Sequence, residues 1–287
     1  MPGVAEMTNN RTPLFIATML FICSVSGRAA DSTRSEEILA HHLDAIATGP
    51  TRTEFKARVV EGTAIYKILA GGTGSIEGKG VVASETNRTR FLFKVVANTY
   101  HGEQFICDGS HVDVAATYSD KSRSELATFI RGQDAPIREG LLGGVLTTAW
   151  PLLRSDASKR LTFEGLKKVG EKELLTFRYH PKKSSDLEIL IYLDPLSFRH
   201  VRTTYHADQA APISFNDVQS ARQMPTRYLL TEEFDQFQTT DGITLPTRYI
   251  LRFRSEQQVL TKEVEWDITV GKVLNNISMD PRNFEIK

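Results

Sequence analysis

The chain has 287 residues, of which 40% are hydrophobic, and its 35 basic and 35 acidic residues give a formal net charge of zero. A dedicated nucleic-acid binder needs a basic surplus to displace counterions, so the composition argues against that class. The length permits one or two domains, and the hydrophobic content is ordinary for a globular protein with a substantial core.

The N-terminus has the pattern of a signal peptide. Arg11 provides a basic flank, an apolar run extends from Leu14 to Val25, and small residues follow in 26–30. The run is intermediate in length between a signal-peptide core and a membrane span, so an uncleaved anchor is the alternative. We therefore expect residues 1–30 to direct export and residues 31–287, which contain no long polar linker, to form a single domain.

Residues 33–48 predict the first helix of the exported chain. Leu39, Leu43 and Ile46 recur on one face, flanked by His42, and Gly49-Pro50 ends the pattern. We expect no metal site here, because the adjacent His41 and His42 point about 100° apart on a helix and no second ligand pair follows at i+4.

Residues 53–117 predict a series of strands. The strongest alternation is in 89–97, where Phe91, Phe93 and Val95 share one face, and Asp108-Gly109 marks a hairpin turn. Cys107 is the single cysteine after the signal peptide and follows apolar residues, so we expect a buried strand thiol and neither a disulfide nor a metal cluster.

The central segment changes to a helical period. Residues 126–130 favour a short helix, and apolar residues at helical spacing then predict a helix over 137–150. Gly143-Gly144 in the middle of that pattern weakens a helix by roughly 1 kcal/mol per glycine. Two interpretations follow: a core helix whose glycines permit close packing, or a mobile lid over a sheet.

From Arg160 onward the pattern predicts an antiparallel meander. Its central hairpin spans 186–206, with alternating apolar residues in the first strand and a turn at Asp194-Pro195. Further strands are predicted at 161–169, 173–180, 227–239, 244–253 and 259–274, and residues 208–225 predict a long loop. A sheet with one wide apolar face must pack on helices or enclose a ligand.

Scattered motifs accompany this order of elements: Phe55-x-Ala57-x-Val59, Gly78-x-Gly80, Asp108-Gly109-Ser110, Tyr192-Leu193-Asp194-Pro195, Gly242-x-x-Leu245-Pro246 and Asp280-Pro281-x-x-Phe284. Together with the signal peptide, the single N-terminal helix and the central helical insertion, they resemble the LolA-like superfamily of outer-membrane lipoprotein-sorting proteins over nearly the whole exported chain.

The resemblance implies an α+β fold, an incomplete, half-open antiparallel β-barrel of about 10–11 strands wrapped over a few helices. It also implies a periplasmic carrier that binds lipid acyl chains or a lipidated protein and localises lipoproteins to the outer membrane, with inner- or outer-membrane proteins as partners. One departure stands out: the family's strand-2 arginine, which helps hold a helical lid closed, has no clear counterpart in Ala83-Ser84-Glu85.

The sequence contains no H-E-x-x-H, C-x-x-C or G-x-S-x-G motif, so we expect neither an enzyme nor a cofactor. His200 and His206 lie about 20 Å apart along an extended strand, too far to share a metal. The acid pair Glu232-Glu233 is expected to be solvated. An acid–base site built by residues that converge only in space is the alternative.

The candidate ligand-lining residues are apolar and come from the strand near 91, the 137–150 segment and the hairpin: Phe91, Phe93, Val95, Leu141, Leu142, Val145, Leu146, Trp150, Ile189 and Ile191. A gap between sheet and helix would make these residues an acyl-chain pocket. The same residues would equally make a dry core, and the alternative function is then a non-enzymatic envelope module with a protein partner.

Overall fold

The computed structural model describes residues 25–95, 97, 100–115, 124–154, 156–183, 185–209 and 225–285, except for the side chains of 25–32 and Thr53. Most of the predicted signal peptide (1–24) and of the predicted loop (210–224) lies outside the described residues. Within these ranges, no helix combines the length and the apolar character needed to cross a bilayer.

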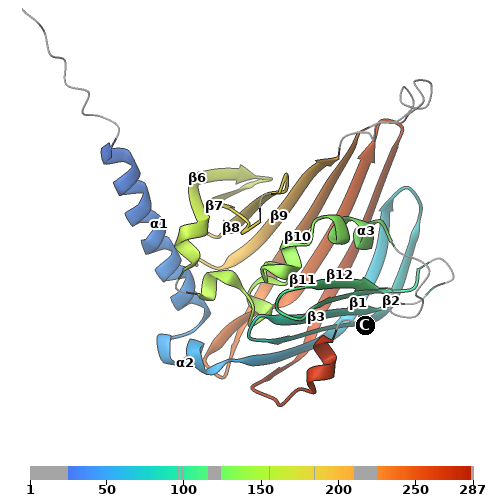
Figure 1. Ribbon diagram of the computed structural model, residues 1–287, viewed down its shortest axis with the longest axis horizontal. Helices are drawn as coiled ribbons and strands as arrows, with labels where there is room; N and C mark the ends of the chain where they lie inside the picture. The colour runs from blue at the N-terminus through green and yellow to red at the C-terminus, as the bar shows by residue number, and fades with distance from the viewer. Residues whose placement is uncertain are drawn as a thin grey trace, which may run out of the picture.

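The strands form one antiparallel sheet of 12 strands, ordered β5-β4-β3-β2-β1-β12-β11-β10-β9-β8-β7-β6 (Figure 1). Their bounds are β1 Ala57–Ala70, β2 Gly74–Glu85, β3 Arg88–Lys94, β4 Glu103–Cys107, β5 Val112–Ala115, β6 Leu161–Val169, β7 Lys172–Tyr179, β8 Glu188–Leu193, β9 His200–Gln209, β10 Thr226–Thr240, β11 Ile243–Gln257 and β12 Leu260–Asn275. β5 and β6 are the two edges, so the sheet is open, as the predicted fold class requires, and its 12 strands slightly exceed the expected number.

Neighbouring strands follow one another along the chain except at one place, where β1 pairs with β12 and joins the N-terminal and C-terminal halves. The predicted hairpin is formed by β8 and β9, and Asp194 Oδ1 accepts the Leu196 and Ser197 N–H groups at 3.1 and 2.7 Å, which fixes its turn. The predicted buried thiol is confirmed, because Cys107 is free and buried at the end of β4.

A register shift between Tyr192 and Leu193 changes which side chains of the hairpin point inward. Simple alternation would place His200 on the face opposite Tyr205, but the structure buries both side chains, at 1% and 0% exposure. A bulge adds one residue to one strand and therefore reverses the facing of the residues on one side of it.

The first helix, α1 (Val25–Ile46), begins earlier than the predicted residue 33, and the short α2 (Gly49–Glu54) follows it. The buried face of α1 includes Ile38, Leu39, His42 and Ile46, whereas Leu43 is only half-buried. The expectation that His42 lies at the edge of the stripe is wrong, because positions i, i+3 and i+7 from Leu39 share one side of a helix.

The predicted short helix is confirmed as α3 (Glu125–Gly132), but the predicted helix over 137–150 is wrong. The structure has only short turns there: α4 Ala135–Arg138, η1 Gly144–Leu146 and η2 Pro151–Leu153; η3 Ala157–Arg160 and, near the C-terminus, η4 Pro281–Phe284 are also short. Gly140, Gly143 and Gly144 have φ of 75°, 79° and 47°, which a right-handed helix cannot accommodate. We call residues 135–153 the cover.

The glycines of the cover permit close packing against the sheet, which was part of the core-helix interpretation. They lie in short turns, however, and not in a helix. A Cβ on Gly143 would lie 2.9 Å from the Phe91 ring, and a Cβ on Gly144 would lie 2.6 Å from His200 Nδ1. The backbone of the cover therefore lies directly against side chains of the sheet, in front of the strands in Figure 1.

Candidate functional site

The structure brings all of the predicted ligand-lining residues into one apolar cluster. Each is at most 2% exposed, whether it comes from β3 and the residue after it, from the cover or from β8: Phe91, Phe93, Val95, Leu141, Leu142, Val145, Leu146, Trp150, Ile189 and Ile191. Their closeness was predicted correctly, and whether they line a ligand cavity stays a prediction.

A carboxylate lies in the middle of this apolar layer. Glu232 of β10 is fully buried, and its Oε1 accepts the Gly143 N–H at 2.6 Å and the Tyr249 hydroxyl at 2.7 Å. Its Oε2 accepts the Tyr205 hydroxyl at 2.6 Å. The expectation of a solvated acid pair is wrong for Glu232, which has the same strand parity as the buried Leu230 and Phe234. This shared parity is the feature of the sequence from which the burial of Glu232 could have been predicted.

The environment of Glu232 makes its charge costly. Burial raises its pKa to about 7, although the three hydrogen bonds from Tyr205, Gly143 and Tyr249 favour the ionised form. Burial, and then the nearby Glu232 carboxylate, hold the pKa of both tyrosines well above their usual value. Glu232 is therefore an acceptor whose ionisation depends on the donors around it.

A buried arginine holds the cover from β1. Arg58 is 2% exposed, and it donates to the Val145 carbonyl at 2.8 Å through Nη1 and to Asn275 Oδ1 at 2.8 Å through Nε. Burial lowers its pKa to about 10. Arg58 was not among the residues predicted from the sequence. Ser84 of β2 also holds the cover, because its Oγ accepts the Thr148 N–H at 2.9 Å.

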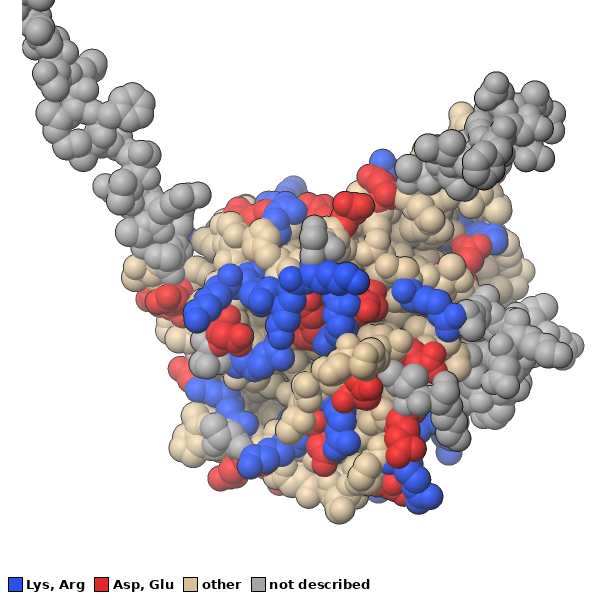
Figure 2. All heavy atoms as spheres, in the orientation of Figure 1, with Lys and Arg blue, Asp and Glu red and all other residues tan. Residues whose placement is uncertain are grey.

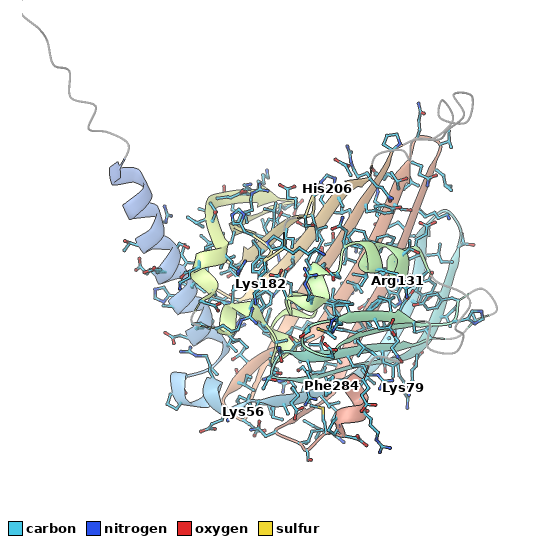
Figure 3. All side chains as sticks on the ribbon, viewed as in Figure 1. Lys56, Lys79, Arg131, Lys182, His206 and Phe284 are labelled. Carbon is cyan, nitrogen blue, oxygen red and sulfur yellow. The ribbon has the colours of Figure 1, made fainter. Side chains whose placement is uncertain are left out.

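A second carboxylate fastens the start of the cover. Glu139 is 4% exposed; its Oε2 accepts the Tyr179 hydroxyl at 2.8 Å and its Oε1 accepts the Lys182 N–H at 2.7 Å. Lys182 lies in the turn after β7 and is labelled in Figure 3, beside the cover. The cover is thus bound to the sheet through individual side chains rather than through strand pairing.

The other end of the cover is bound to α1 through aromatic rings. Trp150 Nε1–H donates to His42 Nε2 at 3.3 Å, and His42 Nδ1 bonds the Phe198 carbonyl at 2.8 Å. The Trp150 ring stacks on His200 with centroids 4.5 Å apart. Burial lowers the pKa of His42 to about 4 and holds that of His200 well below its usual value, so both imidazoles are neutral at pH 7.

A pocket lies on the same sheet under α3, and none of the predicted lining residues belongs to its lining. Its volume is about 410 Å³, and its lining is Tyr66, Tyr100, His101, Gly102, Ser124, Glu125, Leu126, Phe253, Lys262, Val264 and Trp266. The Tyr66 and Tyr100 rings stack at 4.1 Å, and Trp266 Nε1–H donates to the Tyr100 hydroxyl at 2.8 Å. Glu103 adjoins the pocket through Tyr100 and Ser124, and burial raises its pKa to about 8.

The described residues contain no group of three or more His, Cys, Asp or Glu side chains placed to hold a metal ion. On the surface seen in Figure 2, Lys and Arg side chains are interspersed with Asp and Glu, in keeping with the zero net charge. The features that stand out chemically are internal: an apolar layer with a buried acceptor, Glu232, and a buried donor, Arg58.

Comparison with solved structures finds several similar chains. The chain is similar to a LolA superfamily protein from Nitrosomonas europaea, with 13% identity over 88% of this chain and 97% of that chain and a TM-score of 0.48. For an outer membrane lipoprotein-sorting protein domain described from Vibrio parahaemolyticus, the identity is 11%, the coverage 87% and 97%, and the TM-score 0.39.

A structure of the Pseudomonas aeruginosa MucA/MucB complex is also similar, with 10% identity, 85% and 100% coverage and a TM-score of 0.23. No protein-family model and no curated protein matches the chain. All three solved structures are 10–13% identical to the chain in sequence, and all three TM-scores are below 0.5.

Proposed function

We propose that the protein is a non-enzymatic periplasmic carrier, exported by residues 1–30, whose single domain (31–287) binds acyl chains of a lipid or lipidated protein between the sheet and the cover. The observation that carries the proposal is that a continuous apolar layer is closed by a cover bound to the sheet through separate polar contacts, from Arg58, Ser84 and Glu232. Delivery of lipoproteins to the outer membrane, with membrane proteins as partners, is the setting we propose.

The energetics permit an exchange of the cover for a ligand. Moving the cover exposes the apolar residues beneath it, and an acyl chain that enters the same space buries them again. Each buried methylene contributes about 0.8 kcal/mol, so a chain of about 15 methylenes contributes about 12 kcal/mol. That is the scale of the whole stability of a typical domain, about 5–15 kcal/mol, and is large enough to offset the packing lost by a short segment.

A second candidate function rests on the packing itself. The predicted lining residues are at most 2% exposed, which is also the packing of a dry core. In that case the protein is an envelope module that binds a protein partner through its surface, and the cover stays in place throughout.

Hydrogen exchange and native mass spectrometry distinguish the acyl-chain carrier from the dry-core module. The delipidated protein is mixed with three palmitoyl ligands: palmitate, monopalmitoylglycerol and an uncharged N-palmitoyl dipeptide amide. We expect a one-to-one complex with at least one of them, and altered amide exchange in residues 139–153 with unchanged exchange in β11 and β12. Absence of every complex, with unchanged exchange in the cover, would reject carriage and leave the dry-core module.

A further inference from the structure

The pocket under α3 has walls made of aromatic rings. Tyr66 of β1 lies opposite Trp266 of β12 in the strand pairing, and the two rings are tilted by 52° with centroids 5.4 Å apart. Tyr100 stacks on Tyr66, and Phe253 adds a ring from β11. Three neighbouring strands and the residue before β4 therefore gather several aromatic rings around one space.

A buried carboxylate lies behind these rings. Glu103, at the start of β4, is 1% exposed, and it accepts hydrogen bonds from the hydroxyls of Tyr100 and Ser124, which both line the pocket. Burial, and then the charge of Glu103, raise the pKa of Tyr66 to about 12 and hold that of Tyr100 well above its usual value. When it is ionised, Glu103 therefore places a negative charge at the pocket wall.

The two opposite charges of an ion pair meet at the mouth of the pocket. The Lys262 ammonium bonds Glu125 Oε1, and Glu125 Oε2 accepts the Ser255 hydroxyl at 2.6 Å. Both members of the pair are largely exposed, whereas Glu103 is buried. The pair adds no net charge, so the negative charge available to a ligand inside the pocket is that of Glu103.

We propose that this pocket is a second binding site, which takes an organic cation of the quaternary ammonium class against Tyr66, Tyr100 and Trp266, with Glu103 as the opposite charge. It is separate from the acyl-chain site, because none of its lining residues belongs to the cover. A cation within about 6 Å of a ring centre is attracted to the ring face, most strongly for Trp. The volume of about 410 Å³ lies within the usual range for small-molecule sites, about 300–1,000 Å³.

A quaternary ammonium group suits this lining better than other ligands. It has no N–H donor, so it needs contact and charge rather than acceptors, and the Tyr100 hydroxyl is already bonded to Glu103 and Trp266. A divalent metal needs several ligands, and the part of the chain that the structure describes has no suitable group of three acidic, His or Cys side chains. A neutral molecule of the same shape gains burial but no attraction to the rings or to Glu103.

The experiment titrates the protein with choline and with 3,3-dimethyl-1-butanol, in which carbon replaces the charged nitrogen and the shape is kept. It is run at about pH 9, where Glu103, with a pKa of about 8, is mostly ionised. We expect choline to bind at least about 10-fold more tightly. In NMR spectra we expect choline to shift the indole N–H signal of Trp266, and not that of Trp150 in the cover.

A variant tests the part played by the buried carboxylate. Glu103→Gln keeps the size of the side chain and removes its charge, so we expect the preference for choline over the neutral analogue to fall at least about 3-fold. The matched control is Glu233→Gln in β10, whose partly exposed side chain pairs with Arg202 at 3.2 Å. This control is expected to keep the wild-type preference.

Equal affinity for choline and its neutral analogue, or no binding of choline, would overturn the proposal. If Glu103→Gln does not fold, the wild-type comparison and the Trp266 signal still decide, because they need no variant. Glycerophosphocholine distinguishes two sources of the cation: binding as tight as that of choline supports a lipid headgroup, and weaker binding supports a free small molecule. Failure of choline to bind leaves acyl carriage standing, since the palmitoyl ligands test that function separately.

Discussion

Two regions of the same sheet face differ in how their apolar surface is closed. In the first region the cover packs directly on side chains of the strands, including Phe91 of β3 and His200 of β9, and residues such as Leu142 and Ile189 are at most 1% exposed. Over β1, β12 and β11, the pocket of about 410 Å³ remains under α3. The regions meet where the Phe93 and Trp266 rings stack at 6.0 Å. Close packing needs a backbone free of side chains, which the cover glycines provide and α3 does not.

The largest expected effect concerns packing. Leu142 of the cover and Leu126 of α3 are each 1% exposed, but Leu126 lines the pocket. We expect Leu142→Ala to destabilise the protein by about 4 kcal/mol and Leu126→Ala by about 2 kcal/mol, because a side chain beside a cavity has fewer contacts to lose. Urea unfolding of both variants measures the difference. Equal losses would mean that the two regions are equally packed.

The next effect depends on pH through Glu232. Its pKa is raised from 4.5 to about 7 in the folded state. The stability that it contributes is therefore fully present below 4.5 and is lost as the pH rises through about 7. Relative to Glu232→Gln, whose amide does not titrate, we expect the wild-type protein to lose on the order of 3 kcal/mol between about pH 5 and pH 8.

Unfolding of the two proteins in urea at several pH values measures this difference. His42 acts in the opposite direction, because its pKa is lowered to about 4 and its charging on acidification destabilises the fold. His42 is present in both proteins, so its contribution cancels in the comparison. If the free energy of unfolding changed with pH in the same way in both proteins, the pKa of Glu232 would be the same in the folded and unfolded states.

An effect of similar size tests how closely the cover approaches the sheet. Gly144 has φ +47°, and a Cβ there would lie 2.6 Å from His200 Nδ1. We expect Gly144→Ala to cost about 3 kcal/mol, from both the clash and the left-handed backbone. The matched control is Gly165→Ala, with φ +86° and nothing within 4 Å of the Cβ, for which only the backbone cost of about 1 kcal/mol remains. Thermal unfolding measures both, and similar losses would argue against tight contact with His200.

The smallest effect is expected at the rim of the pocket. Lys262 pairs with Glu125, and the two side chains are 48% and 44% exposed. We expect Lys262→Ala to change the free energy of unfolding by less than about 1 kcal/mol, because exposed ion pairs contribute little. A loss comparable to that of Leu142→Ala, in the same urea titration, would mean that α3 is held by this pair and that the pocket is as tightly closed as the cover region.

Much of the architecture follows from patterns within the chain. Alternation and turn residues predicted the strands, including the hairpin of β8 and β9, since the facing of strand side chains is a local property. The same reasoning grouped the apolar residues that the structure brings together. The position of Glu232 could also have been predicted, because its parity matches that of Leu230 and Phe234, but its acidic neighbour Glu233 suggested a solvated pair.

The sequence by itself determined the antiparallel meander, the buried Cys107 and the apolar composition of the layer beneath the cover, because each depends on periodicity and turn chemistry within short segments. Only the tertiary structure decided that 137–150 is a glycine-rich series of turns, and that Arg58 and Glu232 meet its backbone. These contacts join residues 87 and 89 positions apart, and the path of the intervening chain sets such distances. A helical period in the sequence records which residues are buried, whereas the positive φ of Gly140, Gly143 and Gly144 is set by the surface they pack against.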